Sequence, residues 1–161
     1  MKTKMFALAV SAVLAMGALA GCGGQQTAST DTQAEPQYKY VSVQEFKDEI
    51  KEKDDSDPII LDVRKAEDHQ KDGLEGSIGA DMDAAKGGDM ETGKQNMTKA
   101  LEEAGLMKDG KLVENDKDIV LVCYSGKSYA EAATKVLDEM GYNMDDVATL
   151  EGGMKALGVD K

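Results

Sequence analysis

A cysteine stands where a predicted strand gives way to a predicted helix, at Cys123. It follows the apolar run 119–122 and opens the loop 123–128, and residues 129–140 have the apolar spacing of a helix. The free N–H groups and the positive dipole end at a helix N-terminus favour an anion. They therefore favour the thiolate, which is the nucleophilic form of cysteine. The position predicts a reactive thiol, and a cysteine that only packs in the core is the alternative.

The loop itself suits an anion. Gly126 allows a positive φ or a close backbone approach, and small residues let successive N–H groups point inward. Ser125 and Ser128 add hydroxyl donors, and Lys127 adds a cation near the mouth. We expect the N–H groups of residues 124–128, from Tyr124 onward, to form a cradle for a thiolate or a persulfide.

No histidine is placed beside the cysteine by any sequence pattern. The sole histidine of the chain, His69, falls in a predicted polar helix at 65–72. A nucleophile and its base must meet in space, so we interpret His69 as a surface or helix-packing residue. One cysteine and one histidine also do not make a metal site, and we expect neither metal nor cofactor.

The other cysteine, Cys22, ends an export signal. Lys2 and Lys4 precede an apolar stretch at 5–20, and residues 19–22 read Leu-Ala-Gly-Cys. This ending resembles the bacterial lipobox, which implies cleavage before Cys22 and a diacylglyceryl group on its sulfur. The alternatives are an uncleaved anchor and an ordinary cleavage that leaves Cys22 free. The apolar stretch is short and Ala-rich for a membrane span. We expect a signal peptide at 1–21 and a lipid-anchored flexible tether at 22–37, on the extracytoplasmic face of the cell membrane.

Charge excludes some partners. The chain has a formal net charge of −12, and removal of residues 1–21 leaves 17 basic against 31 acidic residues. So acidic a chain is unsuited to nucleic acid or to electrostatic adsorption on anionic lipid. Residues 38–161 remain as one domain with one core.

Strands and helices are predicted to alternate through that domain. Apolar runs at 59–63 and 119–122 are typical of strands buried on both faces, and Ser42 and Glu45 form a capping box. The other predicted elements are strands at 38–41, 78–82 and 147–150, helices at 43–50, 65–72, 96–104, 129–140 and 152–157, and a Gly- and Asp-rich loop at 83–93. This order indicates an α/β fold with a largely parallel sheet. Ligands of such sheets bind at the carboxyl ends of strands, where Cys123 lies.

Four segments in this order resemble the single-domain rhodanese family of sulfurtransferases. They read Leu-Asp-Val-Arg at 61–64, Gly-Ser-Ile at 76–78, Cys-Tyr-Ser-Gly-Lys-Ser at 123–128 and Leu-Glu-Gly-Gly-Met at 150–154. The resemblance covers about residues 40–157. It implies a three-layer domain with a central, mostly parallel sheet flanked by helices.

The resemblance also implies a mechanism. The Cys123 thiolate would take sulfane sulfur from a donor such as thiosulfate, and a thiol or cyanide would accept it from the persulfide. The substrate would be held by the loop residues Tyr124, Ser125, Gly126, Lys127 and Ser128. Asp62 and Arg64 would support the loop or form a buried ion pair that holds strand to helix.

The chain departs from the family pattern at several positions. Many active members have Arg where Ser128 stands, and Arg is the stronger binder of oxyanions. The usual Gly-His is replaced by Asp72-Gly73. A non-catalytic sulfur carrier or protein-binding module is therefore the main alternative. A related phosphatase would need Arg at Tyr129, and a thiol redox protein would need a second, resolving cysteine nearby.

Overall fold

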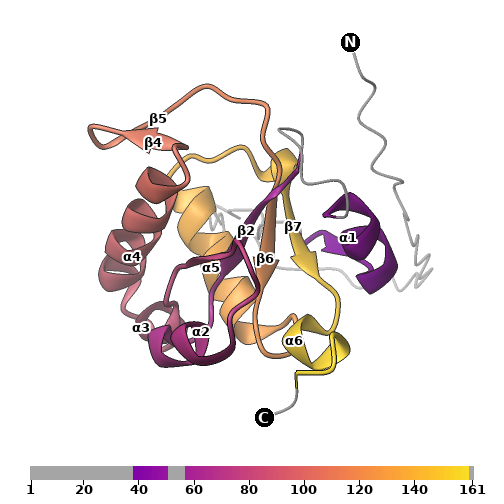
Figure 1. Cartoon of the computed structure of the whole chain (residues 1–161). Coiled ribbons are helices and arrows are strands. Elements are labelled where there is room, and N and C mark those ends of the chain that lie inside the picture. Colours follow the sequence, from indigo (N-terminus) through magenta and orange to yellow (C-terminus); the bar gives the residue numbers. More distant parts are fainter. Residues whose placement is uncertain (1–37, 51–56, 160–161) are drawn as a thin grey trace, which may run out of the picture. The chain divides into compact units, whose positions relative to one another are not determined.

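The computed structural model describes residues 38–50 and 57–159 (Figure 1). The predicted signal peptide 1–21, Cys22 and the rest of the predicted tether to residue 37 lie outside the described residues. Within the described ranges, no helix combines the length and the apolar character needed to cross a membrane.

Five short strands of the described chain form one sheet in which every pairing is parallel. Their order across the sheet is β1-β7-β6-β2-β3, so β6, which precedes Cys123, is the central strand. The strands are β1 (Tyr40–Val41), β2 (Ile59–Asp62), β3 (Ile78–Gly79), β6 (Ile119–Val122) and β7 (Val147–Leu150). The predicted α/β fold with a mostly parallel sheet is confirmed.

Helices cover both faces of this sheet (Figure 1). On one face α1 (Val43–Glu49) and α6 (Gly153–Ala156) pack on side chains such as Ile60 and Val120. On the other face α3 (Asp83–Lys86), α4 (Met90–Glu103) and α5 (Ser128–Glu139) pack on Leu61 and Leu121. Successive residues of β2 and β6 thus enter opposite cores, which explains why both strands are apolar throughout.

The predicted capping box is confirmed at the start of α1. Ser42 Oγ accepts from the Glu45 N–H at 3.2 Å, and Glu45 Oε2 accepts from the Ser42 N–H at 3.0 Å. The predicted polar helix is α2 (Ala66–Asp72), which has no buried residue. The predicted strand at 78–82 is shorter than expected, since β3 ends at Gly79.

The predicted loop at 83–93 is wrong. Residues 83–86 form α3 and residues 90–93 form the first turn of α4, with 87–89 between them, so that α4 begins six residues before the predicted helix at 96. Asp89 caps α4 by accepting from the Thr92 N–H at 3.1 Å. Gly93 lies inside α4, and this position requires glycine because a Cβ there would be 2.5 Å from the Cβ of Ala85. The glycine at the end of the predicted loop is instead a close contact between two helices.

Two further elements have no counterpart among the predictions. A hairpin joins β4 (Met107–Lys108) to β5 (Lys111–Leu112), and a short 3-10 helix, η1 (Met144–Asp146), precedes β7. Both lie near the amino ends of the central strands, at the opposite end of β6 from Cys123.

Candidate active site

Cys123 follows the carboxyl end of β6, and α5 begins five residues later at Ser128. Its side chain is buried and forms no disulfide. The Gly126 N–H donates a hydrogen bond to Cys123 Sγ over 3.2 Å. The loop thus folds back on the sulfur with a backbone donor, as expected for a loop that stabilises a thiolate.

Two glycines make this folding possible. Gly126 has φ +69°, and a Cβ there would lie 2.6 Å from the carbonyl oxygen of Leu150 at the end of β7. Gly153, at the start of α6, has φ +57°, and a Cβ there would lie 2.2 Å from the carbonyl oxygen of Cys123. No other residue type fits either backbone without displacing the active loop.

The start of α6 is bound to the first two loop residues by backbone hydrogen bonds. The Met154 N–H donates to the Cys123 carbonyl at 2.8 Å, and the Lys155 N–H donates to the Tyr124 carbonyl at 3.1 Å. The segments at 123–128 and 150–154, which the sequence could only place in order, are therefore in direct contact. Their contact fixes the direction in which the loop leaves the sheet.

A buried ion pair lies beside the loop. Asp62 and Arg64 are 0% and 1% exposed, and the guanidinium donates to Asp62 from Nε at 3.0 Å and from Nη2 at 2.8 Å. Nη1 donates to Asp72 at 2.7 Å, which joins β2 to the end of α2. Burial opposes the charge of Arg64, but the hydrogen bonds to Asp62 and Asp72 outweigh it and raise its pKa. The expected strand-to-helix ion pair is present, with Asp72 as an additional partner.

Tyr124 connects the loop to this pair. Its ring lies under the Arg64 guanidinium, with 5.7 Å between the guanidinium carbon and the ring centroid. Its hydroxyl donates to a carboxylate oxygen of Asp68 on α2. Burial raises the pKa of Tyr124, so the phenol stays protonated and can donate at neutral pH. The loop is thereby attached to α2 as well as to α6.

The helix side of the loop has a second aromatic contact. The rings of Tyr124 and Tyr129 meet edge to face with 5.1 Å between centroids. The Tyr129 hydroxyl donates to Asp83 on α3, which lowers the pKa of Asp83, while burial and this bond raise the pKa of Tyr129. Tyr129 thus packs the start of α5 against α3.

The remaining loop side chains are open to solvent. Ser125, Lys127 and Ser128 are exposed, and Lys127 precedes the first turn of α5. The recorded donor to Cys123 Sγ is the Gly126 N–H, so inward donation from the other N–H groups of residues 124–128 stays a prediction.

His69 packs between α2 and the turn before β3. Its Nε2 lies 3.2 Å from the carbonyl oxygen and 3.3 Å from the hydroxyl of Ser77. A Cβ on Gly73 or Gly79 would lie 2.6 or 2.7 Å from its ring atoms. This close packing agrees with a helix-packing residue.

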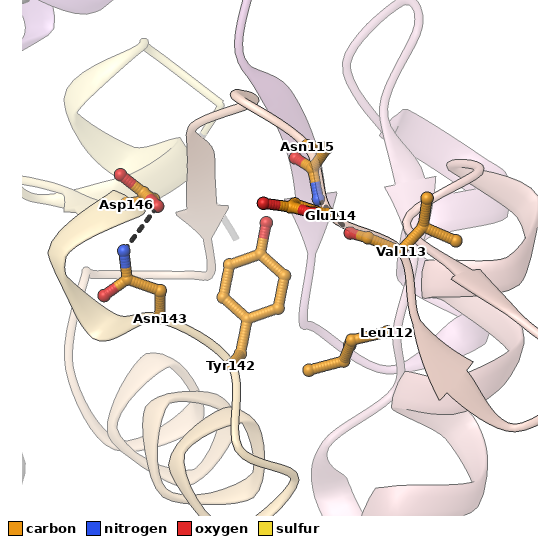
Figure 2. Close-up of a pocket in the computed structure, with 7 residues that line it drawn as sticks. All are labelled: Leu112, Val113, Glu114, Asn115, Tyr142, Asn143 and Asp146. Carbon is orange, nitrogen blue, oxygen red and sulfur yellow. Dashed lines mark hydrogen bonds between the residues drawn. The ribbon is translucent and has the colours of Figure 1, made fainter.

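A shallow hollow of about 330 Å³ lies at the other end of the central strands (Figure 2). It is formed by the segment before β6 and the segment before β7, and Figure 2 shows the Tyr142 hydroxyl pointing toward Glu114 and Asn115. Because β6 runs from this hollow to Cys123, the hollow is separate from the candidate active site.

Comparison with known proteins places the chain in a family. The family model described as "Rhodanese-like domain" matches residues 42–158. A search among curated proteins finds no match. Solved structures share the fold at low sequence identity.

A single domain sulfurtransferase of Saccharomyces cerevisiae has 14% identity and a TM-score of 0.50, over 76% of this chain and 90% of that chain. A rhodanese-related protein of Thermoplasma volcanium has 21% identity and a TM-score of 0.45, over 74% and 89%. A Rhodopseudomonas palustris protein of unknown function, described as a possible tyrosine phosphatase, has 22% identity and a TM-score of 0.48, over 83% and 93%. The family match spans most of the chain, from α1 to α6, and the chain therefore belongs to the rhodanese-like domain family.

Proposed function

We propose that this protein is a sulfurtransferase that moves sulfane sulfur through a persulfide on Cys123. The observation that carries the proposal is the hydrogen bond from the Gly126 N–H to Cys123 Sγ, in a loop that backbone contacts with α6 hold in place. Rhodanese-like domains in general handle sulfur donors and acceptors, which agrees with a thiol in this position.

The reaction has two steps. The Cys123 thiolate attacks the outer sulfur of thiosulfate, the S–S bond of thiosulfate breaks, and sulfite leaves with the bonding electron pair. Cyanide or a thiolate then attacks the outer sulfur of the persulfide, and the Cys123 thiolate leaves. No net redox change occurs on the protein, and the kinetics are ping-pong.

The loop residues have separate roles in this proposal. The N–H groups of residues 124–128 hold the persulfide, and Ser125 and Ser128 offer hydroxyl donors to the leaving sulfite. Lys127 supplies a positive charge near the mouth for an anionic donor. Because Ser128 stands where Arg is common, thiosulfate is expected to bind more weakly than in members with that Arg.

Sulfur transfer from thiosulfate to cyanide by the full-length protein tests the proposal, together with its intact mass after thiosulfate alone. We expect turnover and a mass gain of one sulfur atom. An adduct without turnover would indicate a sulfur carrier. If neither turnover nor an adduct is observed, the result contradicts the proposal and favours a protein-binding module.

That non-catalytic alternative has observations in its favour. Cys123 is 1% exposed, and the exposed Ser128 cannot grip an oxyanion as Arg would. A domain with these two features could bind a partner or keep sulfur without turning it over.

We also propose that lipid on Cys22 anchors the domain to the extracytoplasmic face of the cell membrane, through the tether 22–37. A Cys22→Ala variant lacks the sulfur that carries the lipid. It is therefore expected either to move from the membrane fraction to the soluble fraction or to remain as uncleaved precursor without lipid. Fractionation with metabolic fatty-acid labelling checks this. Labelled, membrane-bound Cys22→Ala protein would refute the lipid assignment.

A further inference from the structure

The active loop is held in place by one of its own side chains. Among loop residues 124–128, the side chain with recorded hydrogen bonds or ring contacts, within residues 38–50 and 57–159, is that of Tyr124. The side chains of Ser125, Lys127 and Ser128 are exposed, and the same part of the chain records no hydrogen bond or ion pair for them. Tyr124 is therefore the side chain through which the rest of the domain sets the shape of the loop.

Two backbone hydrogen bonds give the start of the loop its direction. The Met154 N–H donates to the Cys123 carbonyl at 2.8 Å, and the Lys155 N–H donates to the Tyr124 carbonyl at 3.1 Å. In a trans peptide the C=O and the following N–H point in opposite directions, so the N–H groups of Tyr124 and Ser125 point away from α6. The Cys123 side chain packs in the core on the other face of the sheet from α6, so these N–H groups are directed to the side on which the sulfur lies.

Asp68 provides a further attachment, on a different helix. It accepts a hydrogen bond from the Tyr124 hydroxyl. The two bonds to neighbouring residues of α6 leave the loop free to turn about the line that joins them, and a bond to α2 prevents that rotation. Arg64 contacts both partners, since its guanidinium lies over the Tyr124 ring and donates to the main-chain carbonyl of Asp68 at 3.4 Å.

The helix that carries Asp68 is itself held to the sheet. Arg64, which follows β2, donates to Asp72 at the end of α2 at 2.7 Å. His69, the neighbour of Asp68, has its Nε2 3.2 Å from the carbonyl oxygen of Ser77, in the turn before β3. Asp68 is thus a fixed acceptor, and the Tyr124 hydroxyl transmits its position to the loop.

We infer that Asp68 is a positioning residue for sulfur transfer, which acts through the Tyr124 hydroxyl to keep the loop N–H groups directed at the sulfur of Cys123. The inference rests on the proposed sulfurtransferase function and concerns how that same site is held ready. The Gly126 N–H, the recorded donor to Sγ at 3.2 Å, lies two residues beyond Tyr124 and moves with it. The charge of Asp68 has the opposite effect to its positioning role, because a carboxylate near the loop disfavours a thiolate.

Three variants of the full-length protein separate the hydrogen bond from the charge. Tyr124→Phe removes the hydroxyl and keeps the ring. Asp68→Ala removes the acceptor and the charge together, whereas Asp68→Asn removes the charge and keeps an oxygen that can accept from the Tyr124 hydroxyl. The measurement is kcat/KM for thiosulfate against pH, with cyanide as acceptor. In ping-pong kinetics this ratio belongs to the first half-reaction, and its acid limb reports the ionisation of the Cys123 thiol.

The acid limb of Tyr124→Phe and of Asp68→Ala is expected to move up by about one pH unit, because the displaced N–H groups favour the thiolate less. On the acid side of the limb kcat/KM then falls about tenfold, in proportion to the thiolate fraction. Asp68→Asn should keep the wild-type limb or move it slightly down. Loss of a negative charge alone moves the limb down, so the direction of the shift in Asp68→Ala separates positioning from electrostatics.

Tyr142→Phe is the matched control. It removes a hydroxyl that donates to the Lys117 carbonyl at 3.4 Å, in the hollow at the other end of the central strands (Figure 2), and should leave the profile unchanged. Denaturant unfolding of each variant shows whether it is folded under the assay conditions. Partial unfolding lowers the amount of active enzyme without moving the acid limb, so a merely structural role does not give the expected shift.

Each outcome decides the inference. An upward shift in Tyr124→Phe and Asp68→Ala that is absent from Asp68→Asn and Tyr142→Phe supports it. A downward shift in both Asp68 variants with no change in Tyr124→Phe would show that Asp68 acts by its charge, and the inference would be wrong. Unchanged profiles in all variants would also overturn it while the proposed function stands, and absence of sulfur transfer by the wild type would overturn both.

Discussion

A Cys123→Ser variant is expected to lose sulfur transfer and the one-sulfur mass gain completely, while the domain stays folded. A serine hydroxyl needs a general base to become a nucleophile. The chain has one histidine, and His69 contacts Ser77 between α2 and β3. No imidazole is therefore at hand for a hydroxyl at position 123. Thiosulfate–cyanide turnover and intact mass measure the loss.

Serine is the right replacement because it keeps the local hydrogen bond. Its hydroxyl can accept from the Gly126 N–H that now donates to Cys123 Sγ, whereas alanine would leave that donor without a partner. The free energy of unfolding should change by less than about 1 kcal/mol, which denaturant unfolding measures. Persulfide on the serine variant would contradict the assignment of Cys123 and place the sulfur on Cys22, the other cysteine of the chain.

Local signals in the sequence were sufficient for the elements that position Cys123. The apolar runs of β2 and β6, the capping box of α1 and the strand-to-helix transition at 123–128 depend on neighbours within a few residues. The Asp62–Arg64 pair is also local, since the two residues are two positions apart. A sequence pattern can predict contacts of this kind because all of their parts lie within a few residues of one another.

The errors at 83–93 and at the β4–β5 hairpin have different causes. Gly93 resembles a helix breaker, yet it is the point at which α4 approaches Ala85 of α3. The β4–β5 hairpin had a usable signal, because Asp109-Gly110 is a common two-residue hairpin turn and both residues have a positive φ.

The contacts that support the active loop join residues far apart in the sequence, which a local pattern does not predict. Tyr124 and Asp68 are 56 residues apart, and Tyr129 and Asp83 are 46 apart, so no spacing rule joins them. Asp72 was noticeable only as a departure from the family motif, and its role as a partner of Arg64 depends on how α2 folds back. Lys155 is likewise placed beside the loop by backbone bonds between distant segments.

An Arg64→Met variant is expected to destabilise the domain by about 3–5 kcal/mol, which is a large part of the stability of a small domain. Methionine fills much of the same volume but leaves the Asp62 carboxylate buried without its cation. That carboxylate now accepts from Nε and Nη2 of Arg64, and the Arg64 backbone N–H at 3.1 Å would be its remaining recorded donor. Chemical denaturation of the variant and the wild type at pH 7 measures the difference.

Two comparisons separate the cost of the unpaired carboxylate from lost packing. The double variant Asp62→Asn, Arg64→Met removes both charges and should recover most of the lost stability, because the penalty belongs to a buried charge without a partner. Lys94→Met breaks an ion pair of similar length, 2.7 Å to Glu139 against 2.8 Å between Arg64 and Asp62, in which both side chains are partly exposed. It should cost much less, since water solvates the carboxylate that remains. Equal losses in Arg64→Met and the double variant would show that the unpaired Asp62 carboxylate is not the source of the loss, and would assign the loss to the packing of Arg64 and its bond to Asp72.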